Sequence, residues 1–127
     1  LLAVATLALT ACASMQSAPP TEQLRQRVTD RWQALMAYDY AKAYTFATPA
    51  YRASVSAESY RSRQGAALQR VSADISSVDC PQPNQCKVRV VVGVKPPLSQ
   101  RHGPAITAPV DETWLLEDGQ WWMTEDN

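Results

Sequence analysis

The chain contains little of what common catalytic and metal-binding sites are built from. Among its 127 residues it has one histidine and three cysteines. The histidine, His102, lies in a loop, and a catalytic triad around it would need a nucleophile and an orienting acid that the sequence does not place there. A glycine-rich phosphate-binding loop and the cysteine and histidine spacing of a zinc site are also missing. We therefore expect no metal and no cofactor, and we favour a protein without enzymatic activity.

Excess charge is absent as well. Twelve basic residues balance twelve acidic ones, which argues against bulk electrostatic binding to nucleic acid. The charges are unevenly spread, because residues 21–70 carry eight basic and four acidic side chains and residues 71–127 carry four and eight. We interpret the resulting halves of +4 and −4 as two packed layers that complement each other.

The third absence is a hydrophobic run long enough to cross a membrane. Residues 1–11 carry no charge, but a helix of this length reaches only about half of the roughly 30 Å hydrocarbon core. The length is typical of the apolar region of a signal peptide. Because no methionine and no basic segment stand ahead of it, we expect the true start of the gene product to lie upstream.

At the end of this run, the letters LTAC (residues 9–12) resemble the bacterial lipoprotein signal, in which an apolar residue and two small residues precede a cysteine. The resemblance implies a lipid on the Cys12 thiol, cleavage just before it, and an acylated amino terminus that anchors the protein in a membrane. Ala13 stands where an aspartate would retain the protein in the inner membrane, so the implied location is the outer membrane of a Gram-negative cell, facing the periplasm. The alternatives are an ordinary secretory signal cut after ACA (residues 11–13) and a cytosolic protein with an apolar start.

Cysteine counting bears on the same question. If Cys12 carries a lipid, Cys80 and Cys86 remain as a pair on either side of the loop letters PQPNQ. We predict a disulfide between them, which would contribute about 2 kcal/mol by closing a short loop and would agree with an oxidising compartment. The alternatives are free thiols or a metal site, and the metal site would need two further ligands.

The rest of the sequence predicts one α+β domain over residues 21–127, joined to the lipidated cysteine by a flexible tether over residues 12–20. Between Thr21 and about Tyr38, apolar residues recur at helical spacing, and the charged residues of the segment, Arg31 among them, fall on other faces. The apolar stripe consists of Leu24, Val28, Trp32, Leu35 and Met36. Shorter helices are predicted to begin at three residues that commonly cap helices, Asp39, Thr48 and Ser56, the last of these helices ending at Gly65.

Beyond Gly65 the pattern changes to the alternation of β-strands. Strands are predicted over residues 71–75, 88–94 and 106–116, and a tight turn at 117–120 leads into a fourth strand at 121–124. Pro109 indicates a bulge or an edge in the third strand. Helices followed by an antiparallel meander predict an α+β fold with the N-terminal helices packed on one face of a curved antiparallel sheet.

Two blocks resemble the nuclear transport factor 2-like superfamily, the cone-shaped fold of ketosteroid isomerases and polyketide cyclases. They are RWQALMAYDYAKAYTFATPAYRASVSAESY (residues 31–60) and ETWLLEDGQWWM (residues 112–123). In that superfamily a long helix leads through an acidic-aromatic step into a short one, and a strand with tryptophan turns through Asp-Gly into another aromatic strand. The resemblance covers most of residues 24–124 and is closest to small exported members of unknown activity.

Within that superfamily, enzymes place ionisable groups inside the cone, and an isomerase would need a carboxylate base and a tyrosine in an apolar pocket. The candidates here are Asp39, Tyr40 and Asp111. We prefer structural interpretations for all three: Asp39 as a helix cap, Tyr40 at the edge of the core, and Asp111 with Glu112 as solvated strand surface. Alternation allows at most one of Asp111 and Glu112 to point inward.

Alternation also places the adjacent Trp121 and Trp122 on opposite faces of their strand, so that one fills the core and the other is available for an interaction surface. Our leading hypothesis is a membrane-anchored, non-enzymatic lipoprotein whose domain binds an apolar small molecule or an envelope protein. The alternatives are an isomerase- or cyclase-type enzyme with an apolar pocket and a structural subunit of an envelope complex. The oligomeric state does not follow from the sequence.

Overall fold

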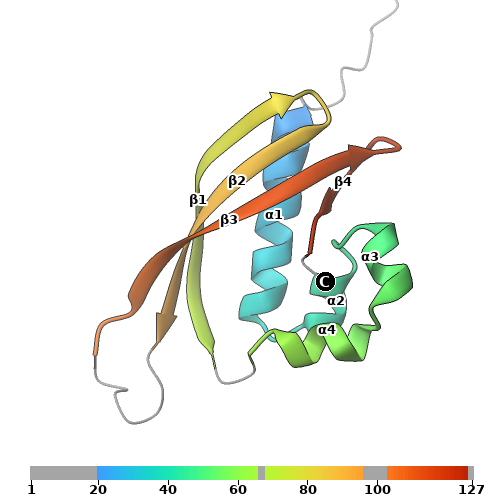
Figure 1. The fold of residues 1–127 in the computed structure, drawn as a ribbon. Coiled ribbons are helices and arrows are strands. Elements are labelled where there is room, and N and C mark those ends of the chain that lie inside the picture. Colours follow the sequence, from blue (N-terminus) through green and yellow to red (C-terminus); the bar gives the residue numbers. More distant parts are fainter. Residues whose placement is uncertain (1–19, 66–67, 96–102, 126–127) are drawn as a thin grey trace, which may run out of the picture.

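The computed structural model describes residues 20–65, 68–95 and 103–125. Within these ranges the chain forms helices followed by an antiparallel sheet, which confirms the predicted α+β class (Figure 1). The proposed signal at 1–11, Cys12, most of the tether and His102 lie outside the described residues, and those predictions stay predictions.

The helical part begins with one long helix and continues with three short ones. These are α1 (Pro20–Met36), α2 (Tyr40–Tyr44), α3 (Pro49–Ser54) and α4 (Ala57–Arg63). Each short helix starts after a predicted cap, because the side chains of Asp39, Thr48 and Ser56 accept backbone N–H groups in the first turns of α2, α3 and α4. Local hydrogen bonding therefore determines these three starts.

The sheet is a meander in the order β1-β2-β3-β4. Its strands are β1 (Gln69–Gln82), β2 (Gln85–Lys95), β3 (Ile106–Glu117) and β4 (Gln120–Met123). β4 pairs with β3 only between residues 114 and 117, so Pro109 lies where no described strand borders the outer side of β3. The pairing of β2 with β3 runs without a register shift, and the proline therefore marks an edge and not a bulge.

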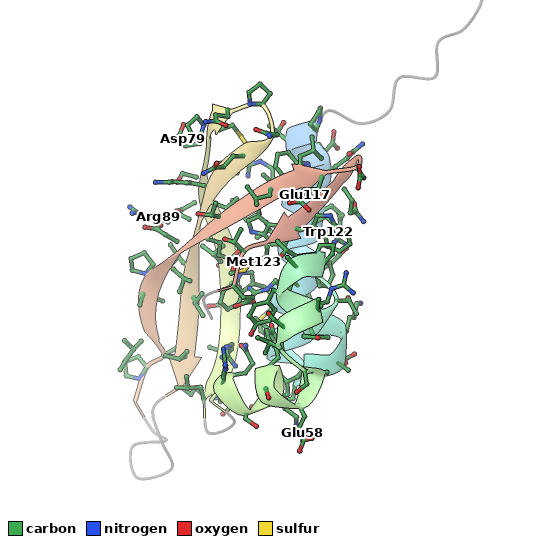
Figure 2. The ribbon with its side chains drawn as sticks, turned by 45° about the vertical axis from the view of Figure 1, so that its right-hand side comes forward. Glu58, Asp79, Arg89, Glu117, Trp122 and Met123 are labelled. Atoms are coloured by element: carbon green, nitrogen blue, oxygen red, sulfur yellow. A yellow bond between two sulfur atoms is a disulfide. The ribbon has the colours of Figure 1, made fainter. Side chains whose placement is uncertain are left out.

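The helices pack on one face of the sheet, and the core lies between the two layers (Figures 1 and 2). Its largest fully buried side chains include Trp114, Trp121, Tyr60 and Leu24. The first predicted strand is only partly right, because Val71 is exposed while Ala73 and Ile75 pack against the core. A register shift between Arg70 and Ser72 reverses the alternation there.

Two further links connect parts of the fold, one a disulfide and the other a pair of backbone hydrogen bonds. The predicted disulfide between Cys80 and Cys86 is present and joins β1 to β2 across their turn. On the β4 side of the sheet, Ala47 forms a parallel bridge with Met123: the Met123 N–H donates to the Phe46 carbonyl and the Thr48 N–H donates to the Met123 carbonyl. The segment between α2 and α3 is thereby tied to the last strand.

Candidate functional site

The interior contains an ion pair between α1 and β3. The Arg31 Nη1 lies 2.7 Å from the Glu112 Oε1, and the two residues are only 4% and 2% exposed. A second carboxylate, Glu125, lies 2.9 Å from the Arg31 Nη2. The Trp114 indole N–H donates to the other Glu112 oxygen at 2.8 Å. We call these residues, together with Tyr60, the buried polar cluster.

Burial is the largest influence on the pKa values of Glu112 and Tyr60 in this cluster. Burial raises the pKa of Glu112, while the Arg31 charge and the Trp114 N–H act against that rise. Burial also raises the pKa of Tyr60, and the nearby Arg31 charge opposes the shift. The Tyr60 hydroxyl faces the cluster without completing a hydrogen bond in the described part of the chain. A buried carboxyl group with a raised pKa could transfer a proton, but both side chains of the ion pair are closed off from solvent.

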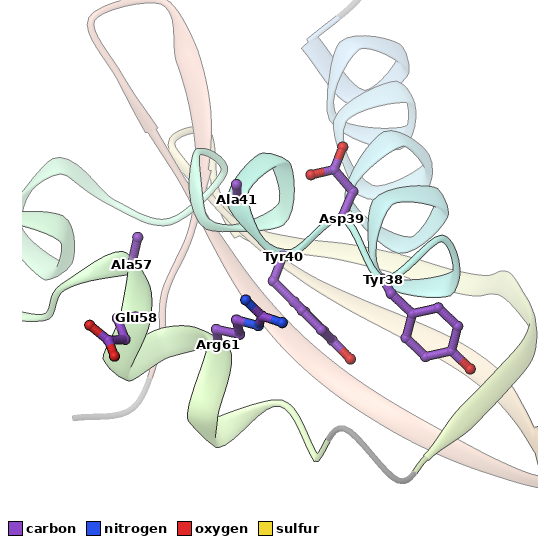
Figure 3. A pocket seen from close by; sticks show the side chains of 7 residues that line it. All are labelled: Tyr38, Asp39, Tyr40, Ala41, Ala57, Glu58 and Arg61. Atoms are coloured by element: carbon purple, nitrogen blue, oxygen red, sulfur yellow. The ribbon is translucent and has the colours of Figure 1, made fainter.

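A second candidate site is open. A surface groove of about 460 Å³ lies between the end of α1, α2 and α4. Its lining consists of Tyr38, Asp39, Tyr40, Ala41, Ala57, Glu58 and Arg61 (Figure 3). We call it the tyrosine groove. The small side chains of Ala41 and Ala57 leave room between α2 and α4, and Figure 3 shows the Tyr40 side chain between those of Arg61 and Tyr38.

Tyr38 holds an unusual position in this groove. It follows the last turn of α1 at φ 58°, where its N–H donates to the Leu35 carbonyl and the Asp39 N–H donates to the Ala34 carbonyl. This is the Schellman arrangement, which favours glycine at the position of Tyr38 because a Cβ is strained at positive φ. The Tyr38 ring is 49% exposed and meets the Tyr40 ring edge-on at 6.4 Å. Because the backbone of Tyr38 is strained and its ring is exposed, helix capping alone does not explain why a tyrosine stands at this position.

The predicted site residues have different outcomes. Asp39 caps α2 as expected and also lines the tyrosine groove, but its carboxylate points away from the Tyr40 ring (Figure 3). Tyr40 is 7% exposed, and its hydroxyl has no hydrogen-bond partner among the described residues. Asp111 is not near them. It faces solvent and forms a two-pronged pair with Arg89, because the strand alternation turns Asp111 outward and Glu112 inward. The preferred interpretation of Asp111 as solvated strand surface is confirmed, and its position does not support it as a catalytic candidate. The expectation that Glu112 is solvated is wrong, because Glu112 is buried.

The tryptophan pair separates as alternation predicts. Trp121 is 1% exposed and its indole N–H donates to the Pro20 carbonyl, so it is excluded from any interaction surface. Trp122 is half-buried and its ring is in contact with two arginine side chains, Arg27 and Arg52.

Sequence reasoning missed Arg31 and Glu112, although both carried a usable signal. Glu112 has the same strand parity as Trp114 and Leu116, which belong to or pack against the core. Arg31 continues the spacing of Leu24 and Val28 toward Leu35, which is the buried face of α1. An inward charge on each of two packed elements predicts an ion pair.

The described residues show neither a membrane span nor a metal site. None of the helices in the described ranges has the length and apolar character needed to cross a bilayer. Over the same ranges, no three histidine, cysteine, aspartate or glutamate side chains gather closely enough to hold a metal ion.

Comparisons with known proteins give a fold and no family. No family model matches the chain, and no curated protein matches it by sequence. Among solved structures, it is similar to a SEC-C motif protein from Psychrobacter arcticus, with a TM-score of 0.64 at 12% identity over 98% of this chain and 75% of that one. A SEC-C motif protein from Rhodopseudomonas palustris gives a TM-score of 0.60 at 11% identity, covering 84% and 85%. An NTF-2-like protein of unknown function from Shewanella oneidensis gives 0.52 at 13% identity, covering 84% and 100%. At these identities the likeness extends to the arrangement of helices and antiparallel sheet.

Proposed function

We propose that the chain is an exported lipoprotein, anchored through Cys12 in the outer membrane, whose domain binds a small ligand in the tyrosine groove without transforming it. The observation that carries the proposal is Tyr38, a half-exposed ring held at positive φ over an open groove. Strain retained at a position that suits glycine is common where a side chain serves binding. Two tyrosine rings supply apolar contact area, and Arg61, Glu58 and Asp39 supply charge around them.

The interior supports binding at the surface over chemistry inside. Trp114, Val88 and Val90 fill the space beneath the helices, and the Arg31 and Glu112 side chains there are paired with each other. We propose that these layers form a filled version of the cone typical of nuclear transport factor 2-like proteins, to which one structural neighbour is similar.

Export is supported by cysteine usage. The Cys80–Cys86 disulfide is typical of proteins that fold in oxidising compartments such as the periplasm. It also leaves Cys12 as the one remaining cysteine of the chain, which fits its role as the lipidated residue.

The second candidate function is an isomerase- or cyclase-type enzyme that uses the buried polar cluster. The raised pKa of Glu112 favours it, because general acids and bases are often buried carboxyl groups with shifted pKa values. It requires the core to open, since Glu112 is 2% exposed.

The binding proposal is tested with benzoate, whose ring suits the tyrosines and whose carboxylate suits Arg61. We expect Tyr38→Gly to weaken benzoate binding at least tenfold while the free energy of unfolding stays unchanged or rises by about 1 kcal/mol, because glycine relieves the strain of positive φ. Tyr38→Phe is the matched control, which keeps the ring and should keep the binding. The measurements are NMR titration and urea unfolding. Equal benzoate affinity in wild type and Tyr38→Gly would refute the proposal that the tyrosine groove binds a ligand.

The anchoring proposal needs a separate measurement. Mass spectrometry of the membrane-extracted protein should find an acylated Cys12 at a new amino terminus, and Cys12→Ser should release the protein from the membrane fraction. An unmodified Cys12 would overturn the proposal of a lipid anchor, and it would not affect the proposal that a ligand binds in the tyrosine groove.

A further inference from the structure

Trp122 on β4 is in cation–π contact with two guanidinium groups from different helices. The Arg27 Cζ lies 5.3 Å from the Trp122 ring centre, and the Arg52 Cζ lies 5.2 Å from it. Arg27 belongs to α1 and also stacks at 4.4 Å over the Phe46 ring, whereas Arg52 belongs to α3. Figure 2 shows Trp122 beside the helical layer. We call Arg27, Arg52 and Trp122 the arginine–tryptophan patch.

Backbone carbonyls fix both guanidinium groups and leave part of each available. The Arg27 Nε and Nη2 donate to the Trp121 carbonyl at 3.1 and 2.9 Å. The Arg52 Nε donates to the Ala47 carbonyl at 3.1 Å. The remaining N–H groups, on the Arg27 Nη1 and on both terminal nitrogens of Arg52, have no hydrogen bond within the described ranges.

No carboxylate forms an ion pair with either guanidinium group of the patch among the described residues. Across residues 20–65, 68–95 and 103–125, the ion pairs involve Arg31 and Arg89. Burial lowers the pKa of Arg27, the charge of Asp30 on the same helix raises it, and the charge of Arg52 lowers it by less than Asp30 raises it. The Asp30 carboxylate also accepts a hydrogen bond from Gln26. An anion that contacts both guanidinium groups would offset the repulsion between Arg27 and Arg52.

We propose that the arginine–tryptophan patch binds a phosphate group. A pair of guanidinium groups offers two positive charges and several N–H donors, which suit the nearly two negative charges and three acceptor oxygens of a phosphate monoester better than the single charge of a carboxylate. The aromatic ring keeps both groups in place through cation–π contact. This site shares no residue with the tyrosine groove, and it stands whether or not that groove binds a ligand.

A hollow next to Arg27 gives room for the rest of such a ligand. It has a volume of about 380 Å³ and lies between the first turns of α1 and the β3–β4 turn. Its lining consists of Glu22, Gln23, Gln26, Arg27 and Gln120. The amide side chains suit a hydroxyl-rich group, and Glu22 would accept a hydrogen bond from it.

The test uses the full chain carrying Cys12→Ala, which removes the predicted lipidation site, and inorganic phosphate as the probe. At constant ionic strength, we expect phosphate to shift the NMR signals of the Trp122 indole N–H and the Arg27 and Arg52 Nε–H in a saturable manner. Arg52→Gln should weaken the affinity at least tenfold. Arg25→Gln, which removes an exposed charge from α1, is the matched control and should bind as the wild type does.

A second arm identifies where the phosphate comes from. Sedimentation with phosphatidic acid vesicles, compared with phosphatidylcholine vesicles, should depend on Arg52 if the group is a lipid headgroup, and should show no binding if the ligand is a free phosphate compound. Either result agrees with the site. A wild type that shows no saturable shift, or an Arg52→Gln variant that binds phosphate as Arg25→Gln does, would overturn it. Thermal unfolding of each variant shows that loss of binding is not loss of the fold.

Discussion

Glu112 and Asp111 are neighbours in β3, and each forms an ion pair with an arginine at 2.7 Å. The Arg31–Glu112 pair lies between the sheet and α1 with side chains 5% and 0% exposed, whereas the Arg89–Asp111 pair lies on the outer face with side chains 53% and 63% exposed. Figure 2 shows Arg89 on the face turned away from the helices. The shortest nitrogen–oxygen distance is therefore the same in both pairs, although the outer pair has two hydrogen bonds and lies in solvent while the inner pair has one and is buried.

The comparison shows that solvent exposure decides how much the loss of one partner of an ion pair destabilises the fold. Removing one partner of the inner pair leaves a charge with no water to solvate it. Removing one partner of the outer pair exposes the other charge to solvent at little cost.

The largest effect is expected from Glu112→Ala. It removes an acceptor from both Arg31 and the Trp114 indole, so the free energy of unfolding should fall by about 3 kcal/mol, the lower end of the range for a broken buried pair, because Glu125 still binds Arg31. Urea unfolding measures this loss. The double variant Arg31→Met with Glu112→Leu removes both charges and should be less destabilised than Glu112→Ala. A double variant that is less stable than the single one would mean that the pair itself stabilises the fold.

A smaller effect is expected from Asp111→Asn. Both side chains of the outer pair are solvated, so the change should lower the free energy of unfolding much less than Glu112→Ala does. The loss should shrink further at high salt, which screens exposed charges. Unfolding in low and high sodium chloride tests both statements. A loss of unfolding free energy equal to that of Glu112→Ala would contradict the argument that solvent exposure separates the two ion pairs.

The smallest expected effect is in the pH dependence of stability, where Glu112 and Asp111 should contribute with opposite signs. Burial raises the pKa of Glu112, so the folded chain binds this proton more readily than the unfolded chain, and the contribution of Glu112 to stability falls as pH rises above its ordinary pKa. The hydrogen bond and charge of Arg89 lower the pKa of Asp111, so its contribution is lost as pH falls below the ordinary pKa. Carbon-13 titration of the two carboxyl groups should give shifts in opposite directions. Parallel shifts would contradict the burial argument.

Most of the local structure could be predicted from the sequence. Asp39, Thr48 and Ser56 act through hydrogen bonds to N–H groups three residues away, so their effect does not depend on the rest of the fold. The pairing of Cys80 with Cys86 is equally local.

The features that could not be predicted are those that depend on distant partners. The spacing of Arg31 indicates the buried face of α1, but a charge there is expected only when its partner is known, and Glu112 lies 81 residues away in the sequence. Val71 is exposed because a register shift between β1 and β2 reverses its direction. The tyrosine groove combines residues from three helices, and its shape depends on how the helices are joined.

The tie between Met123 and the segment of Ala47 has a consequence for the order of folding. α1 receives its deepest partners from residues 112 and 125, and the α2–α3 connection is completed only by β4. Such long sequence separations delay the final packing until nearly all of the described chain is available. During synthesis, α1 can contact β1 early, but the connection between α2 and α3 stays without its strand partner until β4 has emerged. The last residues to be made thus complete the packing of a segment that was made when less than half of the chain existed.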